Sequence, residues 1–458
     1  MSSLIITMQR TVMLLTRTLL LVATFLSLSS AQAAPGQPLP DQAWHRKAVG
    51  FSIGLYYLTL PAEDPAKVAR DLATDKRFAL QVADQLVKKA QSQAMLQIIY
   101  SSKVASEYAP PSIQSLHYFG RGLSQEQAEA LQKAPRALIL TFAHPATQSV
   151  SGLLRAEQFV AELAKKGQII IWDDETREAF TPNAWETRRL KTWDGDIPDV
   201  SKQIVIHAYN NGGPTRSITL GMARFGVPDL VINDSTWSLN RPLGLTINAV
   251  AQQLVEVGAP APNGFLQLSL KSSRHATVRK IFAESVPSSS KGEGRLRLLE
   301  ASPEEGDPRN ALAALNFDAY PGKDITQRQT NFVVSVYGAQ PDDVAYIREN
   351  AALHAASERA RAQLPALQQA FQRGLAPGEQ LQVKAPFTTR DGGREWMWIE
   401  VTEWKGDQVK GMLRNTPRNV PRLQAGQMVE ARQSELFDYL RIFPDGRTEG
   451  NETSKLLR

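Results

Sequence analysis

The chain contains no cysteine among its 458 residues. Disulfides, a lipoprotein anchor, cysteine-bound zinc and a thiol nucleophile are therefore excluded, and packing alone must hold the fold together. The His-Glu-x-x-His pattern of zinc proteases is also missing. These absences point to no catalytic class, and we expect no cofactor.

A strong excess of charge of one sign is missing as well. The chain has 52 Lys and Arg against 46 Asp and Glu, a formal net charge of +6. The basic residues are scattered among acidic ones and do not gather in a stripe, as they do in proteins that bind nucleic acids. We therefore expect no nucleic-acid partner.

A long apolar run, Leu19 to Leu26, occurs near the N-terminus. Arg10 and Arg17 precede it, and Ala31-Gln32-Ala33 supplies the small residues that signal peptidase requires. The run is too short to span a bilayer. We predict that residues 1–33 are a signal peptide, and that the mature protein is periplasmic or secreted, with no permanent membrane anchor after signal cleavage.

Residues 34–284 have the mixed patterns of an α+β region. Early strands are predicted at 51–58, 95–100 and 113–119, with a helix running from Asp64 to about residue 89. Between about 137 and 233 the predicted order is strand, helix, strand, strand, helix, strand. This order is the split βαβ signature of a ferredoxin-like sandwich. Its predicted strands are 138–142, 168–172, 203–206 and 230–232, and its helices 153–163 and 216–225.

A change of composition separates this region from the C-terminal part. Residues 285–307 mix serine, glycine, proline and charge, which predicts a flexible linker or hairpin. A strand at 331–337 and a long helix from Asp342 to Phe371 are expected to follow.

The last part of the chain, residues 341–458, has turn signals at regular intervals between predicted strands at 379–387, 395–404 and 408–413. Short strands with tight turns predict a small, strongly bent antiparallel sheet or barrel packed with the long helix.

Several short motifs mark this C-terminal segment: Pro377-Gly378-Glu379, Glu395-Trp396-Met397-Trp398, Gly411-Met412-Leu413-Arg414-Asn415 and Phe437-Asp438-Tyr439. With them, about residues 351–452 resemble the YegJ-like bacterial domain of unknown function (DUF 2314). The family has no known activity, so the resemblance transfers no catalytic residue. In the central region, the run from Arg216 to Asp229 resembles a second uncharacterised bacterial family (DUF 4261).

Two tryptophans make the predicted strand 395–404 a candidate binding element. Trp396, Trp398 and Glu400 share one face of this strand, because alternate residues of a strand point to opposite sides. Either the long helix covers the tryptophans, or they form an exposed aromatic surface for a peptide or a sugar.

Three polar residues near predicted central strands raise a metal hypothesis. His144 follows the first strand, Asp173 ends the second and His207 lies in the third, and imidazole and carboxylate are zinc ligands. In the predicted topology the third strand runs the other way, which sends His207 to the opposite rim. The simpler interpretation is a turn after His144 and a strand end at Asp173.

The leading hypothesis is a non-enzymatic exported protein whose C-terminal module binds another envelope protein or a peptide. One alternative is an envelope hydrolase or metal-dependent enzyme that uses the central domain. Another is an immunity-like inhibitor. The sequence by itself does not separate these three hypotheses.

Overall fold

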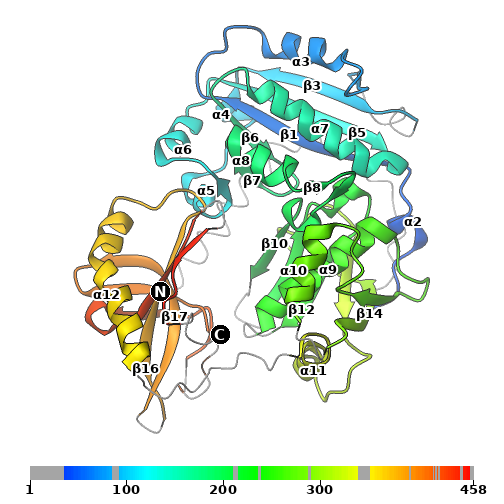
Figure 1. Ribbon diagram of the computed structural model, residues 1–458. Helices are drawn as coiled ribbons and strands as arrows, with labels where there is room; N and C mark the ends of the chain where they lie inside the picture. The colour runs from blue at the N-terminus through cyan, green and yellow to red at the C-terminus, as the bar shows by residue number, and fades with distance from the viewer. Residues whose placement is uncertain are drawn as a thin grey trace. The chain divides into compact units, whose positions relative to one another are not determined.

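A computed structural model describes residues 36–84, 92–209, 215–235, 239–286, 290–338, 351–390, 393–415, 417, 420, 423–443 and 447–453. The predicted signal peptide lies outside these residues. The α+β architecture is confirmed (Figure 1). The chain divides into two compact units, and the C-terminal unit combines Pro341–Arg458 with two earlier segments, Gln114–Gln125 and Thr236–Asn240.

The first sheet of the N-terminal unit is centred on β1, which lies between β5 and β6 and is antiparallel to both. Its strands follow in the order β2-β3-β5-β1-β6-β7. Their bounds are β1 Ala48–Tyr57, β2 Gln81–Val82, β3 Met95–Ser101, β5 Arg136–Pro145, β6 Ile169–Asp173 and β7 Glu178–Phe180. Most residues of β1 are buried, as expected for a central strand.

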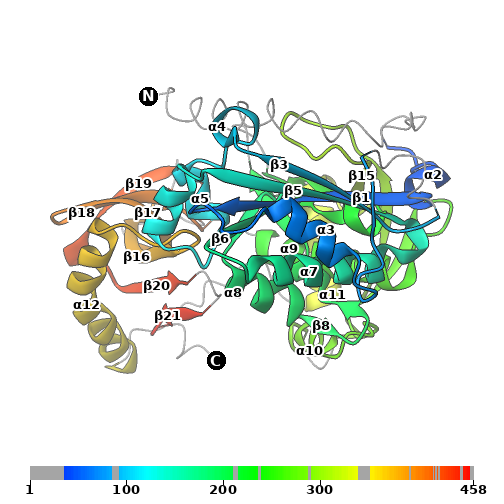
Figure 2. The ribbon, with the colours of Figure 1, turned by 90° about the horizontal axis from the view of Figure 1, so that it is seen from above.

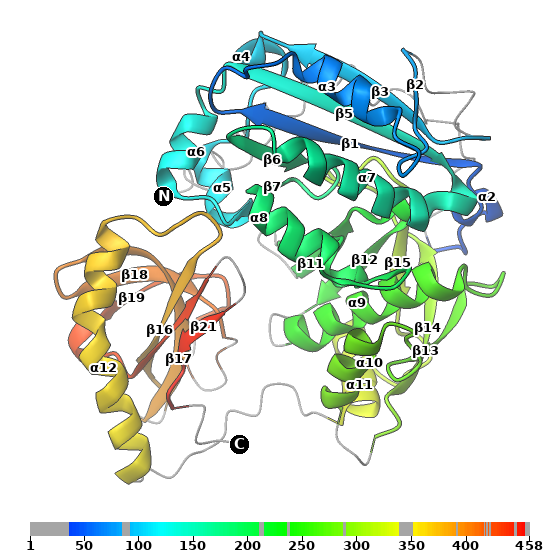
Figure 3. The same cartoon turned by 45° about the horizontal axis from the view of Figure 1, so that its top comes forward.

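Two helices pack against this sheet and against each other, α3 (Pro65–Ala73) and α7 (Ser149–Ala164) (Figure 3). The Asp64 side chain caps α3 by accepting a hydrogen bond from the Ala66 amide, and Pro65 occupies the first helical position. The helix ends at Ala73, well before the predicted end near residue 89.

The predicted ferredoxin-like core is wrong in its choice of strands. The predicted strands 138–142 and 168–172 belong to the first sheet, whereas 203–206 and 230–232 contribute to a different sheet. A β1-α3-β3-β5-α7-β6 arrangement with the strand order β3-β5-β1-β6 nevertheless has the split βαβ pattern. The sequence interpretation overlooked β1 as the strand inserted between β5 and β6, because pairing between distant segments leaves no local signal.

The second sheet of the N-terminal unit has the order β10-β11-β12-β15-β14-β13, in which β12 and β15 are parallel. Its strands are β10 Val205–Tyr209, β11 Thr215–Leu220, β12 Asp229–Ser235, β13 Phe265–Ser269, β14 Glu293–Glu300 and β15 Leu312–Asn316. The three longer helices of this part of the chain are α9 Asn240–Val257, α10 Ala276–Glu284 and α11 Ile325–Tyr337, which are labelled in Figure 2.

Residues 285–307, which the sequence predicted to be a flexible linker or hairpin, contain strand β14. This strand pairs with β13 on one side and β15 on the other, and its Leu296 and Leu298 are fully buried. The alternation of apolar and basic residues therefore outweighs the low-complexity composition that precedes it.

Three shorter predictions of secondary structure fail for a similar reason. Residues 113–119 form helix α5, and residues 331–337 are the second half of helix α11. The predicted helix at 216–225 is strand β11 followed by the single turn η4 (Met222–Phe225). Branched and aromatic residues populate both helix and strand interiors, so short windows do not distinguish the two.

Further short elements lie between residues 41 and 198. They are α2 Asp41–Trp44, α4 Val104–Glu107, β4 Gly120–Arg121, α6 Gln125–Leu131, α8 Pro182–Trp185, β8 Trp193–Asp194 and β9 Ile197–Pro198. No helix in the described part of the chain combines the length and apolarity needed to cross a bilayer.

The C-terminal unit is an antiparallel sheet with one long helix, α12 (Ala351–Gln372), on one face. The strand order is β19-β18-β17-β16-β20-β21, so β19 and β21 are free ends and the sheet is not a closed barrel. The bounds are β16 Gln380–Thr388, β17 Arg394–Lys405, β18 Gln408–Leu413, β19 Met428–Arg432, β20 Asp438–Ile442 and β21 Thr448–Gly450. The predicted start of the helix at Asp342 lies outside the described residues.

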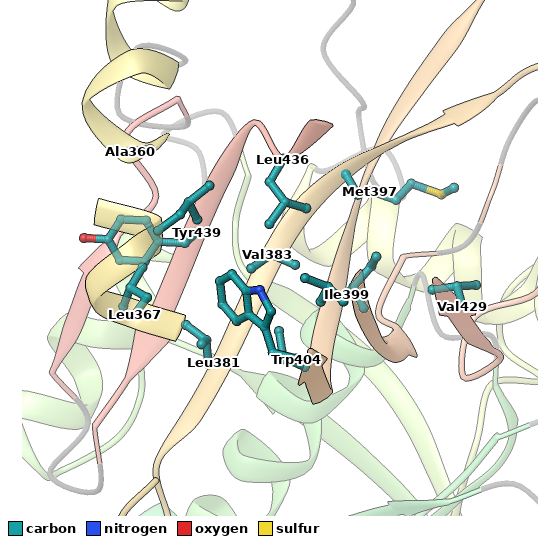
Figure 4. Close-up of a cluster of buried hydrophobic side chains, with 14 of the residues drawn as sticks. Ala360, Leu367, Leu381, Val383, Met397, Ile399, Trp404, Val429, Leu436 and Tyr439 are labelled. Atoms are coloured by element: carbon teal, nitrogen blue, oxygen red, sulfur yellow. The ribbon is translucent and has the colours of Figure 1, made fainter. Parts of the chain in front are cut away.

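Side chains of α12 and the sheet form the core of this unit (Figure 4). Leu364 and Leu367 of the helix pack with Met397 and Ile399 of β17. A β-bulge after Val401 adds one residue to β17 and reverses its alternation. Trp404 therefore faces the core, where Figure 4 shows its ring among the aliphatic side chains.

Candidate functional site

The face of the C-terminal sheet opposite α12 carries the predicted binding residues. Strand alternation separates Trp396, Trp398 and Glu400 from the core residues of β17, as the sequence predicted. The helix does not cover the tryptophans, because it packs on the other face of the sheet. Both indole rings are partly exposed, and Glu400 is buried.

Two residues on neighbouring strands extend this face. Lys384 of β16 pairs across from Trp398, and the Arg414 amide, beyond β18, donates to the Trp398 carbonyl at 2.8 Å. We call Lys384, Trp396, Trp398, Glu400 and Arg414 the tryptophan surface. Local sequence patterns do not join Lys384 and Arg414 to the tryptophans, because only strand pairing brings these residues together.

Local contacts fix the orientation of both tryptophan rings. The Trp396 ring packs on Phe437, with 4.3 Å between the ring centroids. The Lys384 ammonium lies 5.5 Å from the centroid of the Trp398 ring, which is a cation–π distance. Rings held in place in this way lose little conformational entropy when a partner binds.

The charged side chains of the tryptophan surface differ in their partners: Lys384 lies near Asp438, and Glu400 pairs with Arg414. Burial lowers the pKa of Lys384, although the nearby Asp438 opposes this shift. The Lys384 ammonium donates to the Thr453 hydroxyl at 3.5 Å, and this hydroxyl donates to Asp438 at 2.7 Å. Glu400 pairs with Arg414 at 3.3 Å. The surface therefore combines aromatic area with an ammonium group and an ion pair.

The three candidate metal ligands lie in separate places. His144 is the second-last residue of β5 and pairs with Val49, whereas Asp173 ends β6 and pairs with Ile53, on the other side of β1. His207 lies in β10 of the second sheet. Across the described residues, no group of three or more His, Asp or Glu side chains could hold a metal ion. The three side chains do not form a shared ligand set.

His144 is a buried neutral imidazole. Its side chain is inaccessible to solvent, and neither ring nitrogen has a hydrogen-bond partner. The ring packs beside Phe51 and against the Cα position of Gly152 in α7, where a Cβ would lie 2.6 Å from it. Burial, and to a smaller degree Arg155, lowers the pKa of His144 to about 4.

Asp173 belongs to a set of interacting buried charges in the N-terminal unit. We call Glu157, Asp173, Glu178, Arg189 and Arg224 the buried ionic cluster; each is at most 5% exposed. Arg189 donates to Asp173 and to Glu178, both at 2.9 Å, and Arg224 donates to Asp173 at 2.5 Å. Since Arg224 lies in η4 next to β11 and Asp173 in β6, the cluster joins the two sheets.

The cluster shifts the protonation of its acids in opposite directions. Burial opposes ionisation of Asp173, but Arg224 and Arg189 outweigh it and lower the pKa of Asp173 to about 2. At Glu157 burial wins and raises the pKa to about 7. Perturbed acids of this kind often mark active sites. Here Asp173 and Glu178 pair with Arg189 and Arg224, and the burial of these pairs favours a structural role.

A serine motif that the sequence analysis missed has no catalytic geometry. Residues 50–54 read Gly-Phe-Ser-Ile-Gly, the pattern of a hydrolase nucleophile elbow. In such an elbow the serine sits on a sharp turn between a strand and a helix. Ser52 instead lies in the middle of β1, where its hydroxyl is 3.0 Å from the Thr141 hydroxyl.

Comparison with known proteins adds one finding about the C-terminal unit. No curated protein and no solved structure matches the chain. The resemblance of residues 216–229 to a second family is not confirmed and stays a prediction. Residues 349–458 match the model of a family described as an uncharacterized protein conserved in bacteria (DUF2314).

Proposed function

We propose that this chain is an exported, non-enzymatic protein whose C-terminal unit binds another protein of the cell envelope. The tryptophan surface is the observation that carries the proposal. It presents two partly exposed tryptophans on the sheet face away from the core. Tryptophan and arginine are enriched where protein surfaces meet.

The surroundings of this surface favour a protein partner. Met412 of β18 pairs with Glu400 and with Met428 of β19, so the same face continues with two thioethers. Met428 is 58% exposed. Methionine adapts its shape to a partner, and it is enriched at interfaces together with aromatic residues and arginine.

Replacing both tryptophans is expected to weaken partner binding. The purified, immobilised mature protein should capture a defined protein from an envelope extract. Because tryptophans are frequent hot spots of protein interfaces, the double variant Trp396→Ala/Trp398→Ala should bind this partner at least about tenfold more weakly. Affinity would be measured by calorimetry with that partner after its purification.

The matched control is Trp172→Ala, which removes a partly exposed tryptophan from β6 of the N-terminal unit. This variant should bind the partner with the same affinity as the native protein. An unchanged partner list and affinity in the double variant, with its fold intact by circular dichroism, would count against the tryptophan surface.

Export predicts one specific processing event. The mature protein should begin at Ala34, because the Ala-x-Ala pattern ends at Ala33. N-terminal sequencing of protein from the periplasmic fraction should therefore read Ala-Pro-Gly. Replacing Ala31 and Ala33 together with arginine should leave the full-length precursor in the membrane fraction. Finding the native chain unprocessed in the cytoplasm would contradict the proposal.

A further inference from the structure

A short segment from the N-terminal half of the chain belongs to the C-terminal unit. Residues Gln114–Gln125 cluster with Pro341–Arg458 and not with the residues on either side of them in sequence. The point of attachment is the turn that precedes β16. There the Gly378 amide donates to the His117 carbonyl, with 2.6 Å between nitrogen and oxygen.

Two glycines allow the backbones of these segments to touch. A Cβ on Gly378 would lie 2.2 Å from the Gly120 carbonyl oxygen, and a Cβ on Gly120 would lie 2.5 Å from Cβ of Pro377. Neither position has room for a larger residue. Gly378 also has a φ of +79°, a left-handed backbone conformation that residues other than glycine rarely adopt.

Side chains add to the backbone contact. Burial raises the pKa of Tyr118, and Glu400 adds to this shift while Arg414 opposes it, which places the phenol near that ion pair. The Arg121 guanidinium donates to the carbonyls of Tyr118 and Gly120, at 2.8 and 3.2 Å, and fixes the turn that follows α5. The contact between the two segments is therefore made by main-chain groups, and the Tyr118 side chain adds an approach to Glu400 and Arg414.

We infer that the turn Ala376–Glu379 of the C-terminal unit is a peptide-docking site, and that residues 114–121 of the same chain are its ligand. The site binds the C-terminal turn of a helix, which supplies the His117 carbonyl as a hydrogen-bond acceptor and is followed by Gly120. Glu379 holds the turn in place: its carboxylate accepts a hydrogen bond from the Ala376 amide at 3.0 Å and forms an ion pair with Arg441 at 2.5 Å. This inference concerns a contact within the chain and does not require an envelope partner.

Hydrogen exchange in the full-length mature protein tests the docking contact. Gly378→Ala should speed amide exchange in residues 114–121 at least tenfold, because the added methyl group collides with the Gly120 carbonyl. Gly374→Ala is the matched control: Gly374 also has a positive φ, +92°, but nothing lies within 4 Å of its Cβ position. It should leave exchange in this segment unchanged. Equal exchange in the two variants would overturn the inference.

A second experiment tests the ligand side and does not depend on Gly378→Ala folding normally. Gly120→Val should release the segment while the turn stays intact. A labelled peptide with the native sequence of residues 112–125 should then bind this variant in fluorescence anisotropy, at least tenfold more tightly than it binds the native chain, whose site is occupied. Equal binding to both proteins, or to neither, would contradict the assignment of this segment as the ligand.

Discussion

Asp173→Asn is expected to lower the free energy of unfolding by about 3–5 kcal/mol, the cost of removing one partner from a buried ion pair. Asp173 is inaccessible to solvent and accepts hydrogen bonds from both Arg189 and Arg224. Asparagine has almost the same shape but no charge, so Arg224 would lose its ion-pair partner and Arg189 would keep only its pair with Glu178. Urea denaturation at pH 7 would measure the loss.

The control for this substitution is Asp71→Asn, which removes an exposed carboxylate paired with Lys67 at 2.8 Å. Exposed pairs contribute little to stability, so its unfolding midpoint should barely move. The pH dependence offers a second check. Because the pKa of Asp173 is lowered in the folded state, its contribution is present above about pH 4 and is lost as the pH falls toward 2. An unfolding midpoint of Asp173→Asn equal to that of the native protein would rule out this role of the cluster.

Glu157→Gln is expected to remove a loss of stability that the native protein suffers as the pH rises. Glu157 is 1% exposed, its Oε2 accepts from Trp193 at 3.0 Å, and its Oε1 has no partner. Two arginines of the cluster are already balanced by Asp173 and Glu178. An ionised Glu157 would add an uncompensated buried charge, which explains why burial raises its pKa to about 7.

The sign and size of this change in stability with pH follow from the linkage between protonation and folding. In the unfolded chain Glu157 ionises near its ordinary pKa of 4.5, so unfolding releases a proton between pH 4.5 and 7. Stability therefore falls across this window, by about 3 kcal/mol for this residue, and the whole penalty is present above pH 7. Burial also raises the pKa of Glu175 to about 8 and of Asp229 to about 6, so part of the native slope will remain in the variant.

Urea midpoints at pH 5, 6, 7 and 8 should show a flatter profile for Glu157→Gln than for the native protein. The control is Glu162→Gln, which changes a partly exposed acid on the same helix that pairs with Lys165, so this variant should keep the native slope. If Glu157→Gln had the native slope as well, the carboxyl would have to be ionised in the folded state.

Sequence patterns predicted the C-terminal sheet well, because its strands are joined by short turns between neighbours. The predicted strand 408–413 coincides with β18, and 395–404 falls within β17. The alternation that separates Trp396 and Trp398 from the core survives in the structure. What the sequence did not provide was the side on which α12 packs, since both faces of β17 are rich in apolar residues.

Part of helix α11 was predicted as a strand, because the sequence window was too short to show the helical spacing. Residues 331–337 alone look like a strand, since five of the seven are aromatic residues or β-branched valines at close spacing. Over the whole helix, however, the buried residues are Gln329, Phe332, Val333, Val336 and Tyr337, the spacing of one helical face. Asp324 caps this helix by accepting from the Gln327 amide at 2.8 Å. A window that started at the cap would have indicated the helix.

The sequence by itself determined that this protein has no thiol chemistry and an α+β architecture, and it indicated which residues of β17 share a face. These properties follow from composition and local periodicity. Only the tertiary structure decided that β1 lies between β5 and β6, that Asp173 meets two arginines, and that Lys384 and Arg414 flank Trp398. The reason is physical: each of these contacts joins residues far apart in the chain, and their closeness depends on how strands pair and sheets pack.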